Sequence, residues 1–217
     1  VLWAFWGRET FGRSTLTWGA LQGQVASVAQ RLSALGVAPG DRVCAVLPNT
    51  QTALIAFLAT ASIGGVWSLC APDMGHVAIL DRFQQIEPKV MIAQDGYLHA
   101  GKTVDRRGVM ADIWANLPSV DHFVTLSIFD DLPAEHMRWS DMTKDVASFD
   151  PVPVPFDHPL WIVYSSGTTG NPKPIVHGHG GILLEACKQS LHHDLTAKDR
   201  FCWLTSSGWI MWNAQWM

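Results

Sequence analysis

The sequence predicts an α/β protein in which helices pack on and between mostly parallel sheets. Short apolar runs, such as residues 42–47 and 160–164, are typical of buried parallel strands, which are covered on both faces. Segments with apolar residues at helical spacing alternate with these runs, and that alternation is the pattern of βαβ units.

The first half of the chain shows this alternation in order. Thr17 is a good helix N-cap, and apolar residues recur at helical spacing until Gly36, a residue type that commonly follows a helix end. Thr50 or Thr52 is expected to cap a second helix that ends at Ile63. The other expected strands cover residues 66–69, 89–93 and 123–126, and the other expected helices cover residues 77–85 and 105–117.

The second half is expected to form a separate lobe. Residues 130–158 are rich in proline and acidic residues, and we expect them to connect a first α/β lobe (1–129) to a second lobe (159–217). The second lobe is expected to contain strands at 160–164, 174–176 and 201–205, and a helix at 181–191. The chain lacks an initial Met and stops within an aromatic-rich run, so our hypothesis is that both ends are cut through a longer protein.

Composition narrows the functional classes. The chain has 217 residues, of which 48% are hydrophobic, and a net charge of −4, so its composition does not favour a nucleic-acid partner. No apolar run reaches the roughly 18 residues that span a membrane.

The four cysteines are widely spaced, so buried free thiols and a cytoplasmic location are expected. They are Cys44, Cys70, Cys187 and Cys202. The eleven tryptophans are expected to lie mostly in the core. His177 and His179 lack ligands at matched spacing, and no metal site is predicted.

A loop rich in glycine and hydroxyl groups follows the strand at 160–164. It reads Ser165-Ser166-Gly167-Thr168-Thr169-Gly170-Asn171-Pro172-Lys173. Glycines let successive backbone N–H groups turn toward an anion, the hydroxyls donate to phosphate oxygens, and lysine adds a positive charge. Pro172 and Pro174 flank the lysine, which excludes a Walker A loop, and Leu183 replaces the third glycine of a dinucleotide fingerprint. The alternative is a polar surface turn.

This loop matches every position of [ST]-[ST]-G-[ST]-[ST]-G-x-P-K, the signature of the AMP-binding, adenylate-forming acyl-CoA synthetase superfamily. The resemblance extends over residues 40–49, 61–73, 80–89, 176–181 and 208–213. Residues 208–213 read Gly-Trp-Ile-Met-Trp-Asn and resemble the acetoacetate-activating branch more than the acetate-activating branch, which usually has Val-Thr-Gly-His after Gly-Trp. By this resemblance, the chain is part of the large N-terminal domain of an adenylate-forming enzyme.

The resemblance also implies a reaction and its cofactors. A carboxylate, such as acetoacetate or another short acid, attacks the α-phosphorus of ATP bound with Mg²⁺, and coenzyme A then takes the acyl group. In this reading Lys173 is catalytic. The predicted phosphate-binding residues are Ser165, Ser166, Gly167, Thr168, Thr169, Gly170 and Lys173.

Further site residues follow from the same resemblance. Trp209 is expected to flank the acyl pocket, with Ile210 and Met211 beside it, although Trp209 could instead be a core residue, as is expected of Trp212. His99 and Lys102 match positions at which acetate-activating enzymes hold the 3′-phosphate of coenzyme A. Their alternative is a solvated surface role.

Several elements of the superfamily are expected beyond residue 217. They are an acidic Mg²⁺ ligand, an aspartate that holds the ribose, a hinge, and a C-terminal domain with a catalytic lysine. The chain is therefore expected to need the missing C-terminal part of the same protein and to be inactive alone. Two alternatives remain open: an acetyl-, propionyl- or other acyl-CoA synthetase, and a truncated nucleotide-binding module without catalysis.

Overall fold

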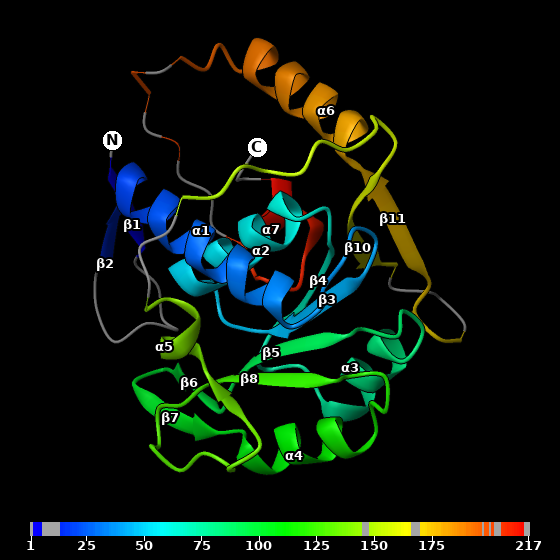
Figure 1. The fold of residues 1–217 in the computed structure, drawn as a ribbon. Helices are drawn as coiled ribbons and strands as arrows, with labels where there is room; N and C mark the ends of the chain where they lie inside the picture. Colours follow the sequence, from blue (N-terminus) through cyan, green and yellow to red (C-terminus); the bar gives the residue numbers. More distant parts are fainter. Residues whose placement is uncertain are drawn as a thin grey trace.

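The computed structural model describes residues 2–5, 14–144, 148–165, 170–196, 198–199, 201 and 205–214 (Figure 1). Its central sheet consists of β3 (Arg42–Val46), β4 (Val66–Cys70), β5 (Val90–Gln94), β8 (His122–Leu126), β9 (Met137–Arg138), β10 (Pro159–Tyr164) and β11 (Pro174–Gly178). The strands lie in the order β11-β10-β4-β3-β5-β8-β9, and every neighbouring pair is parallel except β10 and β11. The predicted α/β class with a mostly parallel sheet is confirmed.

Helices cover both faces of this sheet. One face packs against α1 (Trp18–Ala34) and α2 (Gln51–Ser62), and the other against α3 (His76–Phe83) and α4 (Arg107–Ala115). Alternate residues of β3 enter the two cores: Val43 and Ala45 pack on the α1–α2 side, whereas Cys44 and Val46 pack on the α3–α4 side. Side chains on opposite faces are both buried, and this explains why Val43–Val46 form a continuous apolar run after the partly buried Arg42.

The predicted N-caps of α1 and α2 differ in their hydrogen bonding. Thr17 is the N-cap of α1, and its hydroxyl accepts a hydrogen bond from the backbone N–H of Ala20 at 3.2 Å. Gly36 follows the helix with φ +81°, a left-handed conformation that suits glycine. Thr50 occupies the N-cap position of α2, but its hydroxyl makes no capping hydrogen bond and is buried without a partner among the described residues.

The structure adds elements that the sequence pattern did not predict. Two antiparallel strand pairs lie outside the central sheet in the described residues. One consists of β1 (Leu2–Phe5) and β2 (Ser14–Thr17), and the other of β6 (Gly96–His99) and β7 (Lys102–Asp105). The connection expected at 130–158 contains β9 and the short helix α5 (Trp139–Met142), which is tied to α1 by a hydrogen bond from the Ser27 hydroxyl to the Met142 carbonyl at 2.8 Å. Elements this short have little signal of their own and depend on tertiary contacts.

The last part of the chain packs against the sheet at β10 and β11. It contains α6 (His179–His192) and α7 (Ile210–Ala214), so the predicted helix at 181–191 is confirmed. The strand expected at 201–205 falls mainly on residues 202–204, which lie outside the described residues. Because β10 pairs directly with β4, segments from both predicted lobes share one sheet; the division into lobes remains a prediction.

Buried aromatic residues and thiols occupy the cores. Trp67, Trp161 and Trp212 are fully buried around Phe57, with ring centroids 5.7 to 6.5 Å from its ring. Cys44 and Cys70 are buried free thiols, and burial raises the pKa of Cys70 to about 12. Cys187 is also free but exposed, contrary to expectation, and Cys202 lies outside the described residues. No helix in the described part of the chain has the length and apolar character needed to cross a membrane.

Candidate active site

The predicted phosphate loop connects β10 to β11 at the carboxyl end of β10. The N–H of Ser165 donates to the carbonyl of Lys173 at 3.1 Å, which closes the base of the loop. Gly170 has φ +102°, a conformation that few other residues adopt. Residues 166–169 lie outside the described residues, so the roles of Ser166, Gly167, Thr168 and Thr169 remain predictions. The position fits a ligand site, because open α/β sheets bind ligands beyond the carboxyl ends of their strands.

The end of α3 holds both sides of this loop. The side-chain amide of Gln85 donates to the carbonyl of Pro172 at 2.8 Å, and the hydroxyl of Tyr164 donates to the carbonyl of Arg82 at 3.0 Å. The Arg82 guanidinium lies over the Tyr164 ring, 5.6 Å from its centroid. Burial raises the pKa of Tyr164, so its hydroxyl keeps the proton that it donates. Two side-chain contacts from the sheet and α3 therefore fix the loop's entry and exit.

Lys173 lies at the exit of the loop, one residue before β11. Its side chain is exposed, and no ion pair joins it to an acidic residue in the described part of the chain. An unpaired lysine at the carboxyl edge of the sheet is available to an anionic ligand.

The helix α7 is anchored at the same edge of the sheet. The hydroxyl of Ser207 donates to the carbonyl of Leu47 at 2.7 Å, and the indole N–H of Trp212 donates to the Asn49 side-chain oxygen at 2.8 Å. Leu47 and Asn49 follow the end of β3. A Cβ at Gly208 would lie 3.3 Å from the backbone nitrogen of Ala71, which follows β4, so a glycine suits this close approach. The carboxyl ends of β3 and β4 therefore position α7.

A cavity of about 460 Å³ separates α6 from β10, β11 and α7. The predicted pocket residues Ile210 and Met211 line it. Trp209, predicted to flank the acyl pocket, has 69% of its surface exposed and does not line this cavity, whereas Trp212 is fully buried, as expected of a core residue. The remaining lining residues are Trp161, His177, Gly178, Gly181, Ile182, Glu185, Ala186 and Gln189.

His177 is a polar residue of this cavity whose position the sequence analysis did not identify. It lies opposite Trp161 in the register of β10 and β11, and the indole N–H of Trp161 donates to its Nδ1 at 3.2 Å. Burial lowers the pKa of His177, which favours the neutral imidazole. The alternation of side chains along β11 could have indicated this position. Residues that lie opposite each other on paired strands face the same side of the sheet, so His177 shares a side with the buried Trp161.

Comparison with known proteins decides the family. The family model described as "AMP-binding enzyme" matches residues 3–216. The chain belongs to this family. It is 38% identical to an acetoacetyl-coenzyme A synthetase of Rhizobium meliloti over 91% of the chain, and 34% identical to a malonamoyl-CoA synthetase of Penicillium aethiopicum over 93% of the chain. The structure of an acetoacetyl-CoA synthetase from Streptomyces lividans superposes with a TM-score of 0.90 at 50% identity, over 93% of the chain.

The chain spans about a third of the length of these relatives: 32% of the Rhizobium protein, 30% of the Penicillium protein and 32% of the Streptomyces structure. The high TM-score means that the fold of the segment matches the corresponding segment of a longer synthetase.

The predicted coenzyme A residues lie in another part of the chain. His99 and Lys102 are exposed and flank the turn of the β6–β7 hairpin, in which Ala100 and Gly101 both have positive φ. Figure 1 shows this hairpin at the lower left and β10–β11 at the right. The described part of the chain does not bring these two side chains beside the phosphate loop, so their role remains a prediction. It also gathers no group of three or more His, Cys, Asp or Glu side chains that could hold a metal ion.

Proposed function

We propose that the intact protein is an ATP-dependent, AMP-forming acid–thiol ligase that activates acetoacetate. The carboxylate attacks the α-phosphorus of ATP, forming an acyl-adenylate and pyrophosphate. The thiol of coenzyme A then attacks the acyl carbon and releases AMP. The match of the family model over residues 3–216, together with the loop at the carboxyl end of β10, carries this proposal.

The phosphate loop is suited to stabilise the negative charge that accumulates in the first step. An anionic carboxylate approaches the polyanionic ATP, and further negative charge develops on the departing pyrophosphate. Backbone N–H groups, hydroxyls and the exposed ammonium of Lys173 can stabilise that charge as it develops. Mg²⁺ enters as part of the MgATP substrate and supplies additional charge neutralisation.

The acid is proposed to carry a carbonyl oxygen on its third carbon. Acetoacetate and malonamate, the acids implied by the names of two relatives, share this group. Ile210 and Met211, which line the cavity beside α7, suit the short carbon chain of such an acid. His99 and Lys102 are proposed to contact the 3′-phosphate of coenzyme A.

The test is acid-dependent release of pyrophosphate by the intact protein, with formation of the acyl-CoA measured in parallel. Acetoacetate is expected to give a higher kcat/KM than acetate, propionate or butyrate, and residues 1–217 alone are expected to give no turnover. A preference for acetate or propionate would assign the protein to the alternative synthetases. ATP binding without turnover by the intact protein would make it a non-catalytic nucleotide-binding module.

A further inference from the structure

We propose that His177 selects the acid by donating a hydrogen bond from its Nε2 to the carbonyl oxygen on the third carbon. The inference rests on the proposed function, since it concerns the substrate of the same site. It assigns a role to a polar side chain in the cavity between α6, α7 and the β10–β11 hairpin.

The contact with Trp161 determines which nitrogen of His177 carries the proton. An indole N–H can only donate, so Nδ1 of His177 must accept the hydrogen bond at 3.2 Å. In a neutral imidazole the other nitrogen, Nε2, then carries the hydrogen. Trp161 is fully buried in the core, so its indole is held in place, and the histidine ring and its tautomer are set before any substrate arrives.

The donor atom of His177 is free to meet a ligand. No hydrogen bond joins its Nε2 to any residue that the structure describes, and the atom is not among the fully buried polar atoms. The neighbouring His179 differs, because its Nε2 is buried and has no hydrogen-bond partner among the residues that the structure describes. A single N–H that is oriented but unpaired in a largely apolar cavity is suited to bind one carbonyl oxygen.

The other polar side chains of the cavity suit this role less well. Glu185 forms an ion pair with Lys188 at 2.5 Å, and its carboxylate can only accept hydrogen bonds, so it has no donor for a carbonyl oxygen. Gln189 has a donor amide, but no hydrogen bond within the described residues fixes that amide. His177 is therefore the preorganised donor, and preorganisation reduces the entropy lost on binding.

The chemistry predicts selection between two acids of similar size. Butyrate has a methylene group where acetoacetate has its second carbonyl, so only acetoacetate can accept the hydrogen bond. Binding butyrate in the cavity leaves the N–H of His177 unpaired, whereas binding acetoacetate satisfies it. Removing the donor should therefore lower activity toward acetoacetate and leave activity toward butyrate nearly unchanged.

The experiment compares kcat/KM for acetoacetate and butyrate in the intact protein and in three variants. His177→Phe keeps a ring but removes the donor, and we expect a loss of about 10- to 100-fold for acetoacetate with a change under about threefold for butyrate. His177→Gln restores an N–H and should recover part of the loss. The third variant, Gln189→Leu, removes the rival donor and should not reproduce the selective loss.

Each remaining outcome contradicts the inference. Equal losses for both acids in His177→Phe and His177→Gln, with lowered melting temperatures, would mean that His177 only supports the fold. Unchanged acetoacetate activity in His177→Phe, or a selective loss in Gln189→Leu, would remove His177 from substrate recognition. A wild-type protein that activates no short acid would overturn the proposed function itself, and this failure is distinguishable because it appears before any substitution is made.

Discussion

At the scale of single residues, Lys173 has the clearest expected effect on chemistry. It is exposed at the exit of the loop that Gln85 and Tyr164 hold in place. We expect Lys173→Ala in the intact protein to slow adenylation by roughly 10²- to 10³-fold, about 3 kcal/mol, because a donor to the developing charge is lost. Pyrophosphate release under saturating ATP measures this effect.

A matched control is Lys144→Ala. Lys144 is also an exposed lysine, but it pairs with Asp141 at the end of α5, away from β10 and β11. Its loss should change adenylation by less than about twofold, since an exposed ion pair contributes little. If the two variants have equal rates, Lys173 is not a phosphate ligand.

At the scale of elements, the β6–β7 hairpin depends on a glycine. A Cβ at Gly96 would lie 2.6 Å from the carbonyl oxygen of Val104 on the paired strand and 2.7 Å from the ring of Phe129. A backbone oxygen cannot move away without disturbing the strand pairing. We expect Gly96→Ala to destabilise the intact protein by about 1–3 kcal/mol, measured as a lower denaturation midpoint.

The nearby Gly108, in the first turn of α4, provides the comparison. A Cβ there would meet no atom within 4 Å, and its φ is not positive. Gly108→Ala should therefore raise stability by about 0.5–1 kcal/mol, because alanine loses less backbone entropy in a helix. A Gly96→Ala protein as stable as Gly108→Ala would show that the hairpin can rearrange at no cost.

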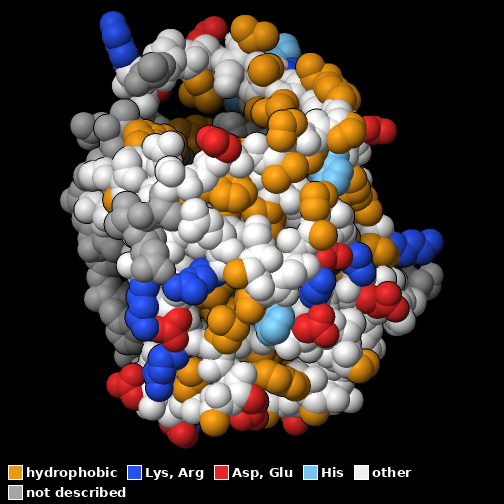
Figure 2. All heavy atoms as spheres, viewed as in Figure 1, with side chains coloured by type: hydrophobic (Ala, Val, Ile, Leu, Met, Phe, Trp, Pro, Cys, Tyr) orange, Lys and Arg blue, Asp and Glu red, His pale blue; other side chains and the backbone are white. Residues whose placement is uncertain are grey.

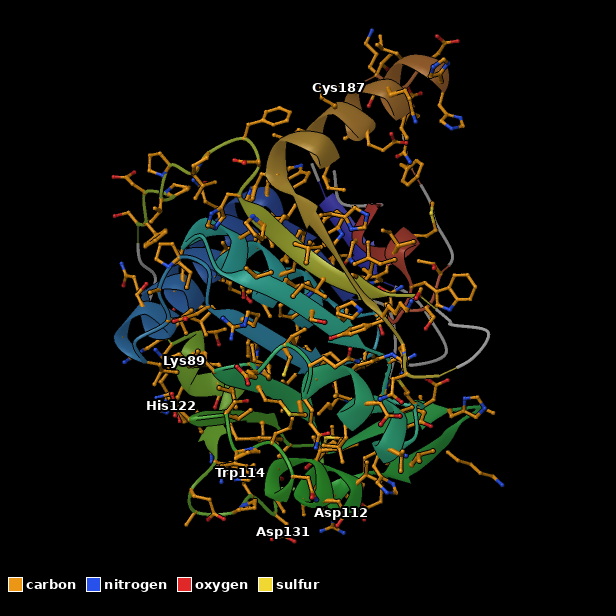
Figure 3. All side chains as sticks on the ribbon, turned by 90° about the vertical axis from the view of Figure 1, so that its right-hand side faces the viewer. Lys89, Asp112, Trp114, His122, Asp131 and Cys187 are labelled. Carbon is orange, nitrogen blue, oxygen red and sulfur yellow. The ribbon has the colours of Figure 1, made fainter. Side chains whose placement is uncertain are left out.

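At the scale of the whole molecule, one face of the chain is unusually apolar. Figure 2 shows hydrophobic side chains gathered along α6 and over the β11 side. In Figure 3, Cys187 of α6 lies at the opposite end of the molecule from Trp114 and Asp131, so this face is separate from the α4 end. The exposed apolar residues on these elements and just after α6 are Ile175, Val176, Leu183, Leu184, Leu191 and Leu195.

This face predicts how residues 1–217 behave as an isolated polypeptide. Exposed patches of this kind associate in water, and β11 is the edge strand of the sheet formed by the described residues. We expect the isolated chain to self-associate at micromolar concentration in light scattering, and Leu183→Glu with Leu184→Glu to reduce that association. A stable monomer that binds no hydrophobic dye would contradict this.

Three histidines give the whole molecule a predictable pH dependence. Burial lowers the pKa values of His136, His177 and His179 below 6.5, so the unfolded chain binds more protons than the folded chain between the folded pKa values and about 6.5. The free energy of unfolding should therefore fall as pH drops below about 6.5 and be nearly flat above it, as far as these groups contribute.

His136→Asn tests one part of this dependence. His136 is stacked on Trp114 and hydrogen-bonded through Nδ1 to the Thr125 hydroxyl at 2.9 Å. The variant should lose some stability at pH 7.5 but show a shallower decline between pH 6.5 and 5.5, measured by urea denaturation. An unchanged slope would mean that His136 does not contribute to it.

Particular residues show how far prediction from sequence reached. The spacing after Thr17 and the apolar run at β3 each correspond to a period that local geometry imposes, so the main helices and strands were predicted correctly. The β6–β7 hairpin, β9 and α5 were missed, because elements of two to four residues carry too little periodicity. Residues 202–204 of the expected strand at 201–205 and residues 166–169 of the phosphate loop lie outside the described residues.

The sequence by itself determined the fold class and the family, because alternating periodicity and a nine-residue signature are local properties of the chain. Only the tertiary structure decided which distant residues meet: Trp161 with His177, Gln85 with Pro172, and Ser207 with Leu47. These contacts depend on the order of the strands and on the segments that follow them. Ser207 and Leu47, for example, are 160 positions apart, and no local sequence pattern encodes their contact. The candidate specificity residue emerged from the structure for that reason.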